Sequence, residues 1–249
     1  MAPGTYRTER CQDTIYHATV GTTGVILDSG NVLLKPVTGV WFPPAAFGEV
    51  LAQRALPWDT TRLDEAVVVA GTYLDEIHSI PVSDEAAERF VWLRYYELLL
   101  SGVGVEDERR GLAAAMHDLW EASLPVEPYS WTVPVLEELA ARQLPVVLLS
   151  DAWPSLRRFY RELGLDGYLK EMVISAEQGV SKPDSRMYAK SLELLEMKPG
   201  DVVFVDDWPE NVHAAVGIGI RGIRLCHEDA ESDPTTEEIT DLRELLALI

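Results

Sequence analysis

Polar residues end several apolar, strand-like runs of this sequence, and their side chains together could act on a phosphorus centre. Asp28 ends the run 24–28, Ser150 ends the run 144–150, and the acid pair Asp206-Asp207 ends the run 201–207. Lys182 lies in a loop-like segment before a proline. A carboxylate can attack phosphorus, a hydroxyl can bind a phosphoryl oxygen and an ammonium can neutralise an anion. Two further carboxylates can hold a hard divalent cation.

Each of these positions alone has an ordinary structural explanation. An Asp at a strand end is often a cap or turn residue, Ser150 would suit a helix N-cap, and Lys182 would suit a solvated loop. Asp206 and Asp207 are more informative, because adjacent carboxylates repel each other unless they share a cation. The specific signal is the whole set, with each member on a different strand end or adjoining loop.

The elements that must position these residues have the pattern of an α/β fold. Continuous β-branched runs predict strands covered on both faces at 24–28, 144–150, 172–175, 201–207 and 222–226. Amphipathic helices are predicted at 133–142, at 155–163 with Ser155 as N-cap, at 185–196 and at 210–216. This alternation indicates a doubly wound, Rossmann-like parallel sheet, in which ligands bind outside the carboxyl ends of the strands.

The interval 37–127 has a different character from the rest of the chain. Its segments 61–74, 83–100 and 106–120 are helix-like and are separated by prolines. We therefore expect an α-helical domain at 37–127, inserted after the first core strand, and a core domain made of 1–36 and 128–249. The tail is predicted to be an acidic loop at 228–234 followed by a helix at 236–246. Residues 1–20 have no clear pattern.

Composition limits the classes of partner. The 249 residues carry 21 Lys and Arg against 41 Asp and Glu, a net charge of −20, which repels a nucleic-acid backbone. No run approaches the roughly 20 apolar residues of a membrane helix, and no secretory signal pattern is visible, so we expect a cytoplasmic protein. The two cysteines, Cys11 and Cys226, are too few for a disulfide framework. A homodimer is left open.

The motifs resemble those of the haloacid dehalogenase-like hydrolase superfamily over residues 24–225. The similar segments are Ile-Leu-Asp-Ser-Gly-Asn-Val-Leu at 26–33, Leu-Leu-Ser-Asp at 148–151, Gly-Val-Ser-Lys-Pro-Asp at 179–184 and Val-Phe-Val-Asp-Asp-Trp-Pro-Glu-Asn-Val-His-Ala-Ala at 203–215. The helical insert occupies the place of this superfamily's cap domain.

The resemblance implies a hydrolase for a small phosphorylated metabolite. Asp28 would be the nucleophile and would form an aspartyl-phosphate that water later hydrolyses. Lys182 would offset the negative charge of Asp28 and of the substrate. The phosphoryl oxygens would be bound by Ser150 and by the loop after the nucleophile, Ser29, Gly30 and Asn31.

The resemblance also implies a magnesium cofactor. Mg²⁺ would be held by Asp28, the backbone carbonyl of Gly30 and Asp207. Asp206 would be a further ligand or would bond to a ligand of the metal. Asn211 matches the position that orients the lysine or the surroundings of the metal.

One position departs from the superfamily's pattern. Its phosphatases usually carry a second Asp two residues after the nucleophile as general acid and base, and this chain has Gly30 there. Such catalysis is typically worth about 10²–10⁴-fold in rate. A cap residue could substitute (Asp75, Glu76 or His78), or catalysis could be lost. We favour a third account, a leaving group that needs little protonation, such as an anomeric sugar phosphate or an acyl phosphate.

Two other functions stay open. A 2-haloacid dehalogenase also lacks the second Asp, but it uses no metal, and the pair Asp206-Asp207 therefore favours phosphorus. A non-catalytic phosphometabolite-binding protein would keep the pocket without the reaction. A hexose-phosphate mutase is disfavoured, because it relies on the missing Asp.

The tryptophans are a further signal, since there are seven. Trp153 and Trp208 could line the crevice or pack in the core. Trp41 and Trp58 could close over it from the insert. For Trp58, Trp92 and Trp120 we expect core packing.

Overall fold

The computed structural model describes residues 21–77, 79–227 and 232–249. Its centre is a six-stranded sheet in the order β5-β4-β1-β6-β7-β8, and every neighbouring pair is parallel. The strands are β1 (Gly24–Leu27), β4 (Val146–Ser150), β5 (Glu171–Ile174), β6 (Val202–Asp206), β7 (Arg221–Leu225) and β8 (Glu237–Ile239). The fold is the expected doubly wound α/β fold.

The central strands are covered on both faces, as their continuous apolar sequences predict. Val25 and Leu27 belong to one buried cluster, with side chains of α5 (Thr132–Ala141), α6 (Leu156–Glu162) and α10 (Leu245–Leu248). Ile26, between them, belongs to a second cluster with α8 (Ser185–Leu195) and α9 (Pro209–Gly217). Successive side chains of a strand point to opposite faces, so a four-residue strand contributes to both clusters.

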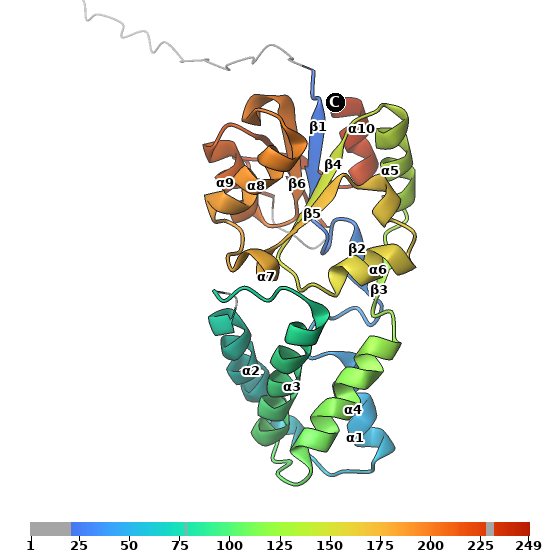
Figure 1. Cartoon of the computed structure of the whole chain (residues 1–249), viewed down its shortest axis with the longest axis vertical. Helices are drawn as coiled ribbons and strands as arrows, with labels where there is room; N and C mark the ends of the chain where they lie inside the picture. Colours follow the sequence, from blue (N-terminus) through green and yellow to red (C-terminus); the bar gives the residue numbers. More distant parts are fainter. Residues whose placement is uncertain (1–20, 78, 228–231) are drawn as a thin grey trace, which may run out of the picture.

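The interval between the first two core strands is helical. It contains α1 (Ala45–Gln53), α2 (Leu63–Ile77), α3 (Glu85–Gly102) and α4 (Arg109–Ala122), which share a third buried cluster. Helix α3 begins at Asp84, whose side chain accepts a hydrogen bond from the Ala87 N–H at 2.8 Å. Figure 1 shows these helices together at one end of the molecule, with the sheet at the other.

Two short strands flank the helical interval. β2 (Leu34–Pro36) and β3 (Val126–Pro128) pair antiparallel, with Lys35 opposite Glu127. The chain therefore leaves the sheet region and returns to it through two adjacent segments. Neither strand was expected from the sequence, because three residues with a proline at one end give no clear alternation. Helix α1, directly after Pro43-Pro44, was also not expected.

The prediction of a helix at 236–246 was wrong for its first half. Residues Glu237–Ile239 form the edge strand β8, and helical structure begins only at Leu242. The carboxylates of Glu237 and Glu238 form ion pairs with Arg221 and Arg224 of β7 at 2.7 and 3.0 Å. These long-range contacts outweigh the helix propensity of glutamate, which is a weak preference.

No helix within residues 21–77, 79–227 and 232–249 is both long and apolar enough to cross a membrane.

Candidate active site

Three parallel strands bring the expected carboxylates and hydroxyl to one edge of the sheet. In the sheet register, Leu27 of β1 lies beside Leu148 of β4 and Val205 of β6. Asp28 therefore follows β1 at the level of Asp206, where β6 ends, and within one residue of Ser150, where β4 ends. All three side chains are buried, with exposed fractions of 6%, 4% and 0%. Parallel pairing alone is enough to gather them.

The ammonium group of Lys182 joins two of these carboxylates. Its Nζ lies 2.7 Å from Oδ1 of Asp28 and 2.6 Å from Oδ2 of Asp206. The Lys182 backbone N–H donates to Oδ1 of Asp151 at 2.9 Å, and this bond holds the loop against the end of β4. Burial by itself lowers the pKa of Lys182, but Asp28 and Asp206 outweigh it, so the pKa is raised and the side chain is an ammonium.

Asp207 adds a third carboxylate to the cluster. One oxygen each of Asp28, Asp206 and Asp207 lies within 4.8 Å of the others. Burial raises the pKa of Asp28 to about 8. Lys182 lowers this pKa, but by less than burial raises it, and the charges of Asp206 and Asp207 raise it further. Burial, followed by Asp206, raises the pKa of Asp207 as well. Three carboxylates against one ammonium leave an excess of two negative charges when all are ionised.

Such a group fits a divalent cation on chemical grounds. The donors are oxygens, the excess charge has the right sign and size, and hard divalent cations prefer carboxylate oxygens. Asn211 supports this arrangement, because its Nδ2 lies 3.2 Å from both carboxylate oxygens of Asp206. The backbone N–H of Trp208 also donates to Asp206, at 2.8 Å. Asp206 is thus held by three groups at once.

The loop after Asp28 makes contacts that were not expected. Ser29 Oγ lies 2.9 Å from the hydroxyl of Tyr160, which is fully buried in α6. Asn31 has φ 57°, and its backbone N–H donates to the Leu34 carbonyl at 2.8 Å. Its Nδ2 donates to Oδ2 of Asp207 at 3.0 Å. The Asn31 side chain therefore faces the acid pair, and its backbone N–H is already bonded to Leu34. The sequence instead predicted that Asn31 contacts the phosphoryl group.

Trp41 lies over the position where the superfamily's second Asp would stand. Among the described residues, a Cβ placed on Gly30 would meet only the Trp41 ring, with Cζ2 at 3.6 Å. The indole is held there by a hydrogen bond from Nε1 to Oδ1 of Asn31 at 3.3 Å. An apolar ring thus borders the site of the missing acid. Glycine at 30 and tryptophan at 41 form a pair that only the structure reveals.

One cavity of about 610 Å³ joins this edge of the sheet to the helical interval. It reaches Asp28, Ser150 and Lys182 in the core, and Leu74, Trp92 and Trp120 in the helices α2, α3 and α4. Of the three acid candidates in the helical interval, Asp75 lines the cavity. Glu76 is not among its described lining residues, and His78 lies outside the described residues.

The tryptophans are placed partly as expected. Trp41, Trp153 and Trp208 line the cavity. Trp58 instead packs edge-on against Phe47, with ring centroids 5.7 Å apart. Trp92 is in the core, as predicted, but it also lines the cavity, as does Trp120. A helix face cannot be assigned to a cavity from the sequence, because apolar spacing is the same for both environments.

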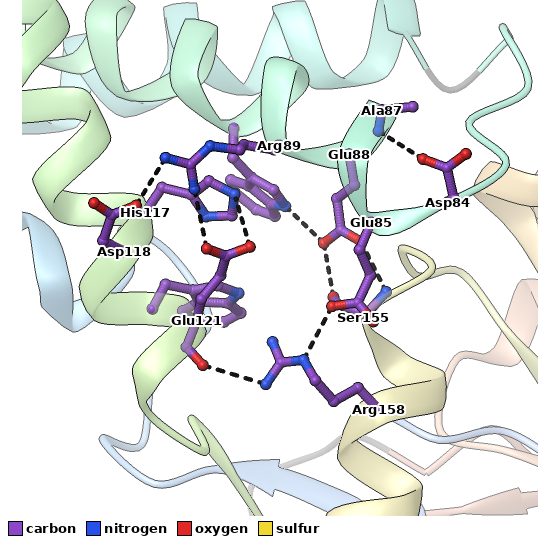
Figure 2. Close-up of polar contacts among 12 residues, drawn as sticks. Asp84, Glu85, Ala87, Glu88, Arg89, His117, Asp118, Glu121, Ser155 and Arg158 are labelled. Atoms are coloured by element: carbon purple, nitrogen blue, oxygen red, sulfur yellow. Dashed lines mark hydrogen bonds and ion pairs between the residues drawn. The ribbon is translucent and has the colours of Figure 1, made fainter.

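Polar contacts, some of them buried, hold the helical interval against the core (Figure 2). Glu88 of α3 accepts hydrogen bonds from the N–H and the Oγ of Ser155, both at 2.7 Å, and from Trp92 Nε1 at 3.0 Å. Arg158 of α6 donates to the Glu85 carboxylate at 3.0 Å and to the Glu121 carbonyl at 3.3 Å. Helices α3 and α4 are thus both held by the start of α6.

Ser155 corrects a detail of the sequence analysis. It precedes α6 as expected, but its side chain makes no capping hydrogen bond. The hydroxyl donates to the buried Glu88 carboxylate instead, and a hydrogen bond to a charged group is stronger than one between neutral groups. Ser155 is therefore part of the contact between helices and core.

Comparison with known proteins decides the family. The model of the haloacid dehalogenase-like hydrolases matches residues 14–219 of the chain, and this range contains all the site residues above. The chain belongs to the haloacid dehalogenase-like hydrolase family. The protein is therefore an enzyme, a hydrolase, as the sequence predicted.

Among the relatives of this hydrolase is a glyceraldehyde 3-phosphate phosphatase from Methanopyrus kandleri. It is 29% identical over 172 residues, which are 63% of this chain and 71% of the relative. A phosphoserine phosphatase from Thermus thermophilus is 32% identical over 118 residues, 44% of this chain and 46% of that protein. The second match therefore spans less than half of either protein.

Solved structures of this family share the fold. A 2-haloacid dehalogenase from Pseudomonas syringae pv. Tomato superposes with a TM-score of 0.64 at 22% identity, covering 92% of this chain and 98% of that one. A phosphatase of the family from Thermococcus onnurineus gives 0.60 at 18% identity, covering 91% and 97%. At these identities the likeness concerns the fold alone.

Proposed function

We propose that this hydrolase is a Mg²⁺-dependent phosphohydrolase that acts on a small phosphorylated metabolite through an aspartyl-phosphate on Asp28. The observation that carries the proposal is the cluster around Lys182. The ammonium bonds Asp28 and Asp206, and Asp207 lies within the same 4.8 Å group. The phosphatase relatives support the choice of phosphorus.

The reaction assigns two successive tasks to Asp28. A carboxylate oxygen of Asp28 attacks phosphorus, the bond from phosphorus to the leaving oxygen breaks, and that oxygen keeps the electron pair. Water then attacks the phosphorus of the aspartyl-phosphate, which releases inorganic phosphate and restores the carboxylate. Lys182 keeps one Asp28 oxygen in place and offsets negative charge throughout. Ser150 and the N–H groups of Ser29 and Gly30 are the proposed donors to the phosphoryl oxygens.

Asp28, Asp206 and Asp207 would hold Mg²⁺, with the Gly30 carbonyl as a further oxygen donor. The bound cation would neutralise part of the charge of the phosphoryl group. Asn31 and Asn211 orient the acid pair through the bonds described above. Asn31 is therefore proposed to act at the acid pair, in addition to the phosphate loop in which the sequence placed it.

We also propose that residues 37–127 are a cap domain on a core of 1–36 and 128–249. The cavity between α2, α3 and α4 and the sheet edge supports this division, as do the separate buried clusters. The cytoplasmic location and the homodimer stay predictions from the sequence.

The test is release of phosphate from 4-nitrophenyl phosphate and from a panel of phosphorylated metabolites, with Mg²⁺ and with EDTA. Wild type should be active with Mg²⁺ only, and Asp28→Asn should lose activity by at least about 10⁴-fold. Asp166→Asn is the matched control, since Asp166 is exposed and is not among the described residues that line the cavity. Full activity in EDTA, or an active Asp28→Asn, would rule out the proposal.

The dehalogenase alternative has its own assay. It predicts halide release from 2-haloacids without metal. A non-catalytic binding protein predicts ligand binding without phosphate release from any ester. The acid pair Asp206-Asp207 is the feature that favours the phosphohydrolase over both.

A further inference from the structure

The cavity that holds the proposed phosphate site is lined by several aromatic rings. Its apolar side is formed by residues before α1, on α3 and α4, and after β4. We call these side chains the aromatic wall: Trp41, Phe42, Trp92, Tyr95, Trp120 and Trp153.

The rings of the aromatic wall pack against one another. Phe42 stacks on Trp92 with centroids 6.1 Å apart and an interplanar angle of 20°. Trp153 meets Trp92 edge-on at 5.8 Å, and Trp120 lies 6.0 Å from it. Trp92 is fixed in turn by its bond to Glu88 at 3.0 Å. A rigid set of rings of this kind favours a flat ring in offset or edge-on contact.

The charges around the cavity exclude a second anionic group on the substrate. Among its described lining residues, Lys182 is the only cation, and it is already bonded to two carboxylates. The described part of the helical interval contributes one charged side chain to the lining, the carboxylate of Asp75. A carboxylate or second phosphate on the leaving group would find no counter-charge on these residues and would be repelled. On the aromatic side, the N–H groups of Trp41 and Trp92 are already bonded. The Tyr95 hydroxyl and the Trp120 N–H are buried, so these groups offer little to the hydroxyls of a sugar.

The surroundings of Gly30 also limit the leaving group, through its need for a proton. The ring of Trp41 borders this position, and the side of the cavity beside Asp28 therefore presents carbon rather than an acid. An alkyl alcohol has a pKa of roughly that of water, 15.7, and leaves poorly without a proton. A phenol has a pKa of about 10 and can leave as phenolate. An aromatic leaving group thus satisfies both the wall and the missing acid.

We propose that the substrate is the phosphate monoester of a flat aromatic hydroxyl compound that carries no second ionised group. The proposal rests on the proposed function. Asp28 attacks phosphorus, the bond from phosphorus to the aryl oxygen breaks, and the aryl oxygen leaves with the electron pair as a phenolate. The phenolate then takes a proton from water. This substrate class differs from the anomeric sugar phosphates and acyl phosphates that the sequence analysis favoured. We prefer it because the aromatic wall suits a flat ring.

The first experiment separates this inference from the proposed function by measuring binding without turnover. Asp28→Asn would be titrated with naphthyl phosphate (the 1-isomer) and with ribose 5-phosphate, in Mg²⁺, and tryptophan fluorescence would be followed. Naphthyl phosphate should bind at least tenfold more tightly. Equal affinities, tighter binding of ribose 5-phosphate, or no binding of either would overturn the inference. Preferential naphthyl binding without any turnover by wild type would instead overturn only the proposed function.

The second experiment measures turnover by wild type of three esters with Mg²⁺. Naphthyl phosphate should have a kcat/KM about 10²-fold above that for ribose 5-phosphate, from ring burial and stacking. Decyl phosphate, which is apolar but has a poor leaving group, should bind with a similar KM and turn over at least tenfold more slowly. Equal kcat values for decyl and naphthyl phosphate would refute the leaving-group argument. Faster turnover of ribose 5-phosphate would overturn the inference and leave the phosphohydrolase standing.

A matched pair of variants tests the wall itself. Phe42 is half-exposed, at 48%, so Phe42→Ala should fold. It should raise the KM for naphthyl phosphate about five- to tenfold and leave both its kcat and the KM for ribose 5-phosphate within twofold. Phe90→Ala is the control, because Phe90 on α3 is 73% exposed and is not among the described lining residues. An equal effect of Phe42→Ala on both esters, or no effect on naphthyl phosphate, would contradict the proposal.

Discussion

Replacement of Lys182 by methionine tests the charge balance of the site directly. Methionine keeps much of the apolar stem but removes the ammonium that bonds Asp28 and Asp206 at 2.7 and 2.6 Å. Both carboxylates are buried, and the Lys182 side chain is 2% exposed. The variant therefore leaves a largely buried carboxylate cluster without its cation.

The expected cost is large because one partner of a buried ion pair is removed. Such removal typically costs about 3–5 kcal/mol. For a chain of this length, 1 kcal/mol shifts Tm by about 2–4 °C, so Tm should fall by about 6–20 °C at pH 8 without metal. Activity with Mg²⁺ should fall by about 10²–10³-fold, the usual effect of losing one electrostatic stabiliser.

The pH dependence has a defined sign. Burial raises the pKa of Asp28, to about 8, in spite of Lys182, and loss of the ammonium raises that pKa further. A carboxyl whose pKa is raised by folding stabilises the folded state below its unfolded pKa, and this stabilisation is lost as pH rises through the folded value. The cost of Lys182→Met should therefore be greatest at pH 8 and above and should shrink as pH falls toward 5. Added Mg²⁺ should also reduce it.

The assay is thermal and urea unfolding of wild type and variant at pH 5 and pH 8, with EDTA and with Mg²⁺. Lys190→Met is the matched control, because Lys190 forms a solvent-exposed pair with Glu193 at 3.0 Å. Such a pair is worth about 0.3–0.5 kcal/mol. If Lys182→Met costs no more than this control at pH 8 without metal, or costs more at pH 5 than at pH 8, the charge-balance reasoning is refuted.

The remaining predictions concern the helical interval. Glu88→Gln should lower the free energy of unfolding, measured in urea, by about 1.5–3 kcal/mol. Charge-assisted hydrogen bonds are lost, and the amide NH₂ group that replaces a carboxylate oxygen faces other donors. An unchanged value would show that these bonds do not hold the helices to the core. Tyr95→Phe should leave stability unchanged or raise it by about 1 kcal/mol in the same assay, since the buried hydroxyl has no partner among the described residues; a loss above about 1 kcal/mol would reveal a partner. Gly102→Ala should cost about 1–3 kcal/mol, because its Cβ would lie 2.4 Å from a Cβ of α2. Gly111→Ala, in an open position on α4, should instead stabilise by about 0.5–1 kcal/mol, and a stabilising Gly102→Ala would contradict the packing of α2 on α3.

Much of the core fold could be predicted from the sequence because its signals are local. The runs at 24–28, 144–150 and 201–207 are apolar without alternation, and strands buried on both faces require such runs. Parallel pairing then places their carboxyl ends together, so the convergence of Asp28, Ser150 and Asp206 follows from strand order.

Other elements escaped prediction because their cause is long-range. The edge strand β8 exists because Glu237 and Glu238 meet arginines of β7, and nothing within 236–246 shows this. The pairing of β2 with β3 joins residues about ninety positions apart along the chain. The Ser155 hydroxyl bonds Glu88 rather than its own helix for the same reason.

The sequence by itself determined which chemical groups this hydrolase has: a nucleophilic carboxylate, a lysine, an acid pair and no acid at position 30. Those facts depend only on residue types at strand ends and in the adjoining loops, which are fixed by local pattern and order. Only the tertiary structure decided that Trp41 covers Gly30, that Asn31 turns to Asp207 and that rings from α3, α4 and two loops line one cavity. These are contacts between distant segments, and their geometry depends on how the helices pack against the sheet, which no local pattern encodes.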